Sequence, residues 1–187
     1  MFTKKTMDEL ERKSAEEMNS AAKNPIIIIL DDVRSMQNVG AIFRTADAFA
    51  ITAIYLCGYT PAPPHRDIHK TALGATETVT WKHFPDTIAA IEEAKEQGFD
   101  IYAVEQTHNS TSLQDIHVSL GKGMALVFGN EVNGVSDGAL ALSKAAIEIP
   151  QWGSKHSLNI SVSVGVVVWD LLHKMNTKSN HTQNLIA

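Results

Sequence analysis

The sequence predicts a three-layer α/β fold built on a mostly parallel β-sheet. First, Ile26–Leu30 is an uninterrupted aliphatic run rich in isoleucine, which is typical of a strand buried on both faces of a parallel sheet. Second, strand-like and helix-like segments alternate along most of the chain. Third, 187 residues with a hydrophobic content of 44% suit one globular domain with a short extension.

The chain begins with a segment unlike the rest. Residues 3–23 are charge-balanced and helix-prone, and Leu10, Ala15 and Met18 give them only a thin apolar stripe. We therefore expect an accessory helix that docks weakly or on a partner, ended by Asn24-Pro25. The expected organisation is an N-terminal helical extension over 1–24, a globular domain over 25–175 and a flexible tail over 176–187.

Hydrophobic periodicity and turn residues define the elements of the globular domain. After the first strand, a loop with three prolines and several glycines mark the boundaries between successive helices and strands. The expected helices are Val39–Phe49, Asp67–Leu73, Asp86–Gln97 and Asp137–Leu142. The expected strands that follow Ile26–Leu30 are Ile51–Leu56, Val79–Trp81, Ile101–Val104, Met124–Phe128 and Ala146–Ile149.

Residues 160–172 are ambiguous on local grounds. Ile160–Val164 alternates with a period of two and is rich in β-branched residues, which favours a strand. Ser157, however, could cap a helix, on which Val162, Val166, Trp169 and Leu172 would form one apolar stripe.

Composition excludes several classes of protein. The longest apolar runs are too short to cross a bilayer, and the N-terminus lacks the apolar core of a signal peptide. The single cysteine, Cys57, fits a reducing cytoplasm and a buried thiol. No dinucleotide or P-loop glycine motif is present, and the histidines show no metal-ligand spacing, so we expect no metal.

The net charge of −5 argues mildly against a general nucleic-acid binder, but the charges are unevenly distributed. Acidic residues dominate between Asp86 and Asp115, where Glu105 also lies, and indicate a solvated acidic face. Basic residues instead lie in or beside loops that follow strands, and would make one face cationic if those loops converge. They are Arg34, Arg44, His65, Arg66, His69, Lys70, Lys122, Lys155 and His156.

Two compact polar motifs follow predicted strands, which is where open α/β sheets bind ligands. The first motif is Asn38-Val39-Gly40-Ala41-Ile42-Phe43-Arg44. Asn38 could cap a helix, and Arg44 could form bidentate hydrogen bonds with phosphate or ribose oxygens. Ion pairing with Asp47 or Asp31 is the structural alternative for Arg44. In the second motif, Gly129-Asn130-Glu131-Val132-Asn133-Gly134, the glycines let backbone groups face a ligand.

The third motif covers residues 149–163 and begins where the last expected strand ends. Its sequence is Ile-Pro-Gln-Trp-Gly-Ser-Lys-His-Ser-Leu-Asn-Ile-Ser-Val-Ser. Ser157 and Asn159 would offer a hydroxyl and an amide at the start of the next helix. In this order, the three motifs resemble the signature of the SpoU/TrmH family of RNA 2′-O-methyltransferases. Thr71-Ala72-Leu73-Gly74-Ala75 agrees with the same resemblance, which spans roughly residues 26–173.

The resemblance implies a specific fold, cofactor and assembly. It implies a C-terminal deep trefoil knot, which connection rules alone would not predict, and a helix over 160–172 packed tightly through Ser161, Ser163 and Gly165. It also implies S-adenosylmethionine as cofactor and a homodimer with active sites at the interface. The substrate would be the ribose 2′-hydroxyl of a tRNA or rRNA. The compact size of the chain favours tRNA.

The resemblance also assigns roles to residues of the motifs. The residues implied in catalysis are Arg44, Glu131, Ser157 and Asn159, with Asn38 supporting the first loop. The cofactor would be bound by Gly129, Ile149 and Leu158, with Ser157 and Val104 nearby. Because guanidinium remains protonated, Arg44 is interpreted as an electrostatic stabiliser rather than a base.

Two alternatives stay open. The chain could be a non-catalytic RNA-binding or assembly factor that retains the fold, or a knotted methyltransferase that acts on a base or small molecule. The four intact polar residues speak against the first alternative, and the third motif speaks against the second.

Overall fold

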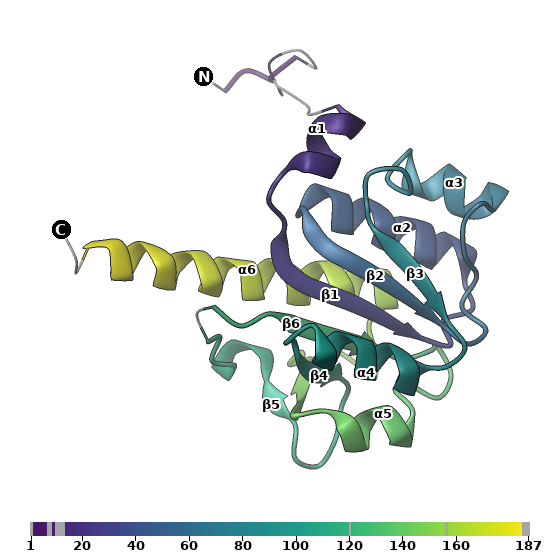
Figure 1. Cartoon of the computed structure of the whole chain (residues 1–187). Coiled ribbons are helices and arrows are strands. Elements are labelled where there is room, and N and C mark those ends of the chain that lie inside the picture. The colour runs from purple at the N-terminus through teal and green to yellow at the C-terminus, as the bar shows by residue number, and fades with distance from the viewer. Residues whose placement is uncertain (1, 7–8, 10–13, 120, 156, 185–187) are drawn as a thin grey trace.

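The computed structural model shows a central β-sheet covered by helices on both faces (Figure 1). It describes residues 2–6, 9, 14–119, 121–155 and 157–184, and the side chains of these residues up to position 177. Leu10 and His156 therefore lie outside the described residues. None of the described helices is long and apolar enough to cross a membrane.

The sheet has seven strands in the order β3-β2-β1-β6-β4-β7-β5, and every neighbouring pair is parallel. The strands are β1 (Asn24–Asp31), β2 (Ile51–Cys57), β3 (Trp81–Phe84), β4 (Asp100–Val104), β5 (Thr111–Ser112), β6 (Met124–Phe128) and β7 (Ala145–Glu148). The side chains of Ile26–Leu30 are fully buried, as the aliphatic run predicts. Each contributes about 1.5–3 kcal/mol of hydrophobic stabilisation.

Helices form the outer two layers. They are α1 (Ala15–Ser20), α2 (Met36–Ala48), α3 (Arg66–Ala72), α4 (Thr87–Glu96), α5 (Asp137–Leu142) and α6 (Ile160–Asn184), with a 3₁₀ turn at Leu113–Asp115. Helices α2, α3 and α6 share one core with one face of the sheet, and α4 and α5 share a second core with the other face (Figure 1). The predicted three-layer architecture is confirmed.

The order of the strands creates a switch point between β1 and β6. The chain leaves β1 towards β2 on one side, and it leaves β6 towards β7 on the other side. Loops diverge at such a point and leave a crevice at the carboxyl ends of the strands. Asp31, at the end of β1, is almost fully buried there and accepts hydrogen bonds from Thr87 Oγ1 (2.5 Å) and Ser136 N (2.8 Å). Its carboxylate thereby ties β1 to the starts of α4 and α5.

Several element boundaries differ from the expectation. The strand expected at Val79–Trp81 begins only at Trp81, because turns follow α3 through residue 78 and Val79 is a buried loop residue. Of the helix expected over 3–23, the described residues contain α1 alone. Ser14 and Glu17 form a capping box at its start, and α1 buries no side chain. The short strand β5 and the 3₁₀ turn were not expected.

Residues 160–172 form a helix, as the resemblance implies and propensity alone does not. Helix α6 continues to Asn184, so it includes most of the tail expected over 176–187. Within one chain, α6 does not pack tightly through Gly165, because a Cβ atom placed there would meet no atom within 4 Å. The expected apolar stripe is split: Leu172 is buried, whereas Val162, Val166 and Trp169 are exposed.

Candidate functional site

A cavity of about 590 Å³ opens at the carboxyl ends of β4, β6 and β7. Its volume lies within the usual range for pockets that bind small molecules and cofactors. Apolar side chains of Val104, Phe128 and Ile147 come from the three strand ends. The loops over residues 129–134 and 149–159 supply the rest of the wall, together with the start of α6.

The loop over 129–134 is held in a tight conformation by its own hydrogen bonds. Asn130 and Gly134 exchange backbone hydrogen bonds of 3.2 and 3.1 Å, and Asn130 Oδ1 accepts from the backbone N–H groups of Val132 and Asn133. Gly134 has a positive φ of 68°. A Cβ on Gly129 would overlap the backbone of Gly134 and Val135. These contacts explain why the second motif has glycine at both ends.

Glu105 braces this loop from the end of β4. Its Oε2 atom accepts a hydrogen bond from Val135 N at 2.9 Å, and its Oε1 atom accepts one from Gln106 N at 2.9 Å. The sequence placed Glu105 on a solvated acidic face, and this interpretation is wrong because the residue lines the cavity. Its position directly after a buried strand was the signal that could have identified it.

Glu131 connects the second motif to the loop that leads into α2. Its carboxylate accepts hydrogen bonds from Arg34 N (3.3 Å), Ser35 N (3.3 Å) and Asn38 Nδ2 (3.0 Å). Partial burial alone would raise the pKa of Glu131. The hydrogen bonds that favour the charged form outweigh it, so the pKa is lower than the ordinary value. Glu131 is therefore an anion at neutral pH.

Asn38 also reaches the third motif. Its Oδ1 atom accepts a hydrogen bond of 3.1 Å from Asn159 Nδ2. Asn159 Oδ1 in turn accepts from Ser161 N at 2.9 Å and from Ser161 Oγ at 2.6 Å. Glu131, Asn38 and Asn159 thus form a polar chain, which we call the three-motif network. It fixes the amide orientation of both asparagines relative to the cavity.

Both helix caps differ from those expected. Ser35 caps α2, and its Oγ atom accepts from Asn38 N at 3.2 Å, so Asn38 lies inside the first turn with its side chain free to bond Glu131. Asn159, rather than Ser157, bonds the free N–H group of Ser161 at the start of α6. Ser157 is exposed and lines the cavity. Its hydroxyl therefore lies at the wall of the cavity rather than at the helix terminus.

The structure brings nearly all of the expected site residues to this cavity. Those that line it are Val104, Gly129, Glu131, Ile149, Ser157, Leu158 and Asn159, and Asn38 joins them through hydrogen bonds. Arg44 is the exception. It lies six residues after Asn38 on α2, about 9 Å along the helix axis, and lines a separate hollow of about 620 Å³ with Lys70, Leu73 and Gly165.

The structural alternative for Arg44 has no support among the described residues. Asp47 instead accepts a 2.5 Å hydrogen bond from Thr78 Oγ1, and Asp31 is bonded to Thr87 and Ser136. No ion pair among the described residues involves Arg44. The guanidinium is therefore available to a ligand or to a second subunit.

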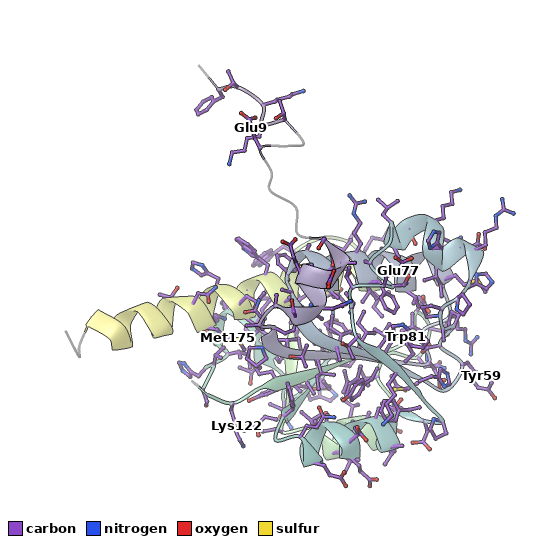
Figure 2. The ribbon with its side chains drawn as sticks, turned by 45° about the horizontal axis from the view of Figure 1, so that its top comes forward. Glu9, Tyr59, Glu77, Trp81, Lys122 and Met175 are labelled. Atoms are coloured by element: carbon purple, nitrogen blue, oxygen red, sulfur yellow. The ribbon has the colours of Figure 1, made fainter. Side chains whose placement is uncertain are left out.

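The expected convergence of the basic residues occurs only in part. Arg66, His69 and Lys70 lie together on α3, and Arg44 lies across the hollow from Lys70. Lys122, however, pairs with Asp100 at 2.7 Å at the amino-terminal end of β4, away from the cavity. Figure 2 shows it at the opposite end of the molecule from Tyr59, which follows β2.

The cavity carries negative charge. Glu105, Glu131 and Glu148 are among its lining residues, and no lysine or arginine is among those described. Such a wall favours a cationic ligand and disfavours a polyphosphate. Within the described part of the chain, no group of three histidine, cysteine or carboxylate side chains could hold a metal ion.

Comparisons with known proteins agree with the family resemblance of the three motifs. The model of the SpoU rRNA Methylase family matches residues 25–169. The tRNA (guanosine(18)-2′-O)-methyltransferase of Thermus thermophilus is 31% identical over 162 residues, which cover 87% of this chain and 81% of that protein. Two solved structures each align with a TM-score of 0.75 at 26% identity.

The first of these structures is the TrmH/SpoU tRNA modifying enzyme of A. aeolicus, where the alignment covers 88% of this chain and 82% of that one. The second is an AdoMet-bound rRNA methyltransferase from Sinorhizobium meliloti, with 81% and 57% covered. The family match spans the sheet and all three motifs. This chain belongs to the SpoU rRNA Methylase family.

Proposed function

We propose that the protein transfers a methyl group from S-adenosylmethionine to a ribose 2′-hydroxyl of RNA. The observation that carries this proposal is the acidic cavity and the three-motif network at its edge, on a chain of this family. The related Thermus enzyme is named as a 2′-O-methyltransferase of tRNA guanosine, and the Sinorhizobium relative as an rRNA methyltransferase.

The cavity fits S-adenosylmethionine in size and charge. Its volume of about 590 Å³ and apolar strand ends suit a flat adenine, and its three carboxylates suit a ligand with sulfonium and ammonium groups. We assign cofactor binding to Gly129, Ile149 and Leu158, with Ser157 and Val104 nearby. The absence of lysine and arginine from the described lining argues against ATP or NAD in the same place.

The bound cofactor supplies an electrophilic methyl group, and the protein must orient the 2′-oxygen in line with it. Glu131 and Asn38 hold the amide of Asn159 at the cavity edge, where it and the Ser157 hydroxyl can bond the ribose. Arg44 stabilises the developing alkoxide and the adjacent phosphate. The proton of the 2′-hydroxyl passes to RNA phosphate or to water.

This role for Arg44 requires a second subunit. In one chain Arg44 lies outside the cavity, beside Gly165 of α6. The same side of the molecule exposes Val162, Val166 and Trp169, and the tilted rings of Trp169 and Phe49 lie 6.0 Å apart between centroids. Exposed apolar surface of this kind usually marks an interface. We infer a two-fold homodimer through α6, in which Arg44 of one subunit serves the cavity of the other.

Finer points of the fold and location belong to the same proposal. The segment over 149–159 and the loop over 129–134 wall one cavity, which is compatible with a deep trefoil knot at the C-terminus. We assign residues 25–175 as the catalytic unit, supported by the family match over 25–169.

The buried single thiol of Cys57 suits a cytoplasmic location. We favour tRNA as the substrate because the aligned tRNA enzyme matches over 81% of its length.

One experiment tests this function. The purified protein is incubated with labelled S-adenosylmethionine and bulk tRNA or rRNA, and the RNA is digested to nucleosides and mapped. We expect label on a ribose 2′-oxygen. Label on a base would indicate a different methyl acceptor. RNA binding without any methylation would indicate a non-catalytic assembly factor.

A further inference from the structure

A second hollow lies on the far side of α3 from Arg44. Its volume is about 530 Å³, and it shares no lining residue with the acidic cavity or with the hollow of Arg44. The residues that give it chemical character are His65, Arg66, Ile68, His69, Glu77 and Trp81. We call it the Trp81 hollow.

The apolar part of the Trp81 hollow can receive a flat ring. Trp81 is half-buried at the start of the edge strand β3, where it packs against the core shared with α3 and lines the hollow. Ile68 is fully buried and Pro63 half-buried beside it. Figure 2 shows Trp81 on β3 with Glu77 near it on the preceding turn. An indole at the rim of a hollow is a stacking surface that accepts any nucleobase.

The polar part of the hollow combines one arginine, two histidines and one carboxylate, which belong to Arg66, His65, His69 and Glu77. Arg66 and His69 are exposed on α3, and neither takes part in an ion pair among the described residues. His65 Nδ1 accepts a 3.2 Å hydrogen bond from Asp67 N, so the neutral ring carries its proton on Nε2, which is then a donor. These groups suit a phosphate. The carboxylate of Glu77 suits an exocyclic amino group.

The position of the hollow relates it to RNA rather than to a metal or a small anion. Its two histidines and Glu77 form no metal-binding group among the described residues. Helix α3 places Arg66 and His69 in this hollow and Lys70, the residue after His69, in the hollow of Arg44. Arg66, Lys70 and Arg44 therefore put three basic side chains along the two hollows of a protein whose net charge is −5.

We propose that the Trp81 hollow binds one unpaired nucleotide of the substrate RNA, away from the methylated ribose. Its base stacks on Trp81 and donates an exocyclic amino hydrogen to Glu77, and its phosphate bonds Arg66 and His69. Adenine, cytosine and guanine carry such an amino group and uracil does not, so the site favours the first three. This inference rests on the proposed RNA methylation and adds a subsite to it.

Steady-state methylation and equilibrium RNA binding test the subsite on the full-length protein. Arg66→Ala and Trp81→Ala are compared with Trp81→Phe, which keeps an aromatic ring. Lys95→Ala, on α4 across the sheet, is a matched control for the loss of one exposed basic residue. We expect Arg66→Ala and Trp81→Ala to raise the RNA Kd and KM by about tenfold. The kcat at saturating RNA and the affinity for S-adenosylhomocysteine should stay unchanged.

The salt dependence separates contact with RNA from a structural effect. Loss of a phosphate contact lowers the slope of log Kd against log salt by about one for Arg66→Ala. If Trp81→Ala unfolds, Arg66→Ala and Glu77→Ala, both at exposed positions, still decide the question, because Glu77→Ala removes the hydrogen-bond acceptor. Wild-type KM, Kd and salt slope in both Arg66→Ala and Glu77→Ala would overturn the subsite while leaving methylation intact. Absence of RNA binding by the wild-type protein would overturn both proposals.

Discussion

The side-chain amide of Asn159 donates a 3.1 Å hydrogen bond to Asn38, 121 positions earlier in the chain. Asn38 in turn donates to Glu131, so three loops that leave different strands share one polar chain. An asparagine can accept and donate at once, which is why this residue type suits the central position. The geometry of the candidate site therefore depends on all three loops together.

Replacing Glu131 tests this dependence. Glu131→Gln places an amide where three N–H donors now meet a carboxylate, so the network should rearrange. We expect the rate of methyl transfer to fall by about a hundredfold, because a small misplacement of the reacting groups has an effect of this size. The measurement is the single-turnover rate at saturating RNA and cofactor. A variant with a wild-type rate would show that the network does not orient the site.

The lowered pKa of Glu131 also predicts the response to acid. A carboxyl group with a lower pKa in the folded state stabilises the fold above its unfolded pKa of about 4.3. That contribution is lost as the pH falls through the lower folded pKa. Even pH 6 is about two units above this unfolded pKa. The ionisation of Glu131 should therefore leave the free energy of unfolding unchanged between about pH 6 and 8. The measurement is the melting temperature of the wild type and of Glu131→Gln between about pH 6 and 8. A pH dependence in the wild type that Glu131→Gln abolishes would contradict the prediction.

Arg44 should matter for chemistry and not for folding. Arg44→Ala should cut methyl transfer by two or more orders of magnitude, which corresponds to about 3 kcal/mol. Arg44→Lys should restore only part of the rate, because an ammonium group cannot form the bidentate fork. Cofactor affinity and melting temperature, measured on the same preparations, should stay near wild type. A less stable variant with most of its activity per folded molecule would make Arg44 a structural residue.

Cofactor binding should depend on the glycine at the end of β6. S-adenosylhomocysteine should bind with about micromolar affinity, and ATP and NADH should not compete. Gly129→Ala should weaken binding by more than about tenfold, since its Cβ would overlap Gly134 and force the loop open. Gly153→Ala is the control, because its Cβ would meet no atom within 4 Å. Calorimetry that shows equal heats for the two variants would contradict this assignment.

The homodimer should depend on Trp169, which is 63% exposed. Trp169→Glu places a charge on the exposed face of α6, and we expect it to convert dimer to monomer in light scattering. Tyr59→Glu is the matched control, since Tyr59 is 84% exposed and lies just after β2, at the right-hand edge of the molecule in Figure 2. A wild-type protein that is monomeric at working concentration would remove the basis for the dimer.

Cys57 should be inert in the folded protein. Burial raises the pKa of its thiol to about 12, so alkylating reagents should label it only after denaturation. The unfolded thiol ionises near pH 8.5 (about the ordinary value). Its contribution to stability is therefore complete below that pH and is lost as the pH rises towards the folded value. Cys57→Ala should reduce this alkaline loss in thermal melts. Rapid labelling of native protein would contradict the burial.

Local patterns were enough to predict the sheet and its layers. The run Ile26–Leu30 predicted a strand buried on both faces because periodicity depends only on neighbouring residues. The strand expected at Val79–Trp81 was misplaced for a related reason: Val79 is buried, but in a loop. Sequence pattern reports burial more directly than it reports backbone conformation.

Long-range contacts were beyond local patterns. Glu105 accepts a hydrogen bond from Val135 N, 30 positions away, and only its position directly after a buried strand distinguishes it from the other acidic residues of its segment. The motifs placed Arg44 beside Asn38 in sequence, but the helix carries it out of the cavity. Its side chain could be located only once the packing of α2 against α3 and α6 was known.

The close approach of α2 and α3 has a mechanical consequence. Gly40 leaves no space for a Cβ, because Thr71 Oγ1 and the carbonyl oxygen of Ile68 occupy it. Sliding of the two helices past each other would break these contacts, so α2 and α3 form one packed unit. If α3 holds the RNA as proposed, this packing fixes the position of the bound strand relative to Arg44 on α2.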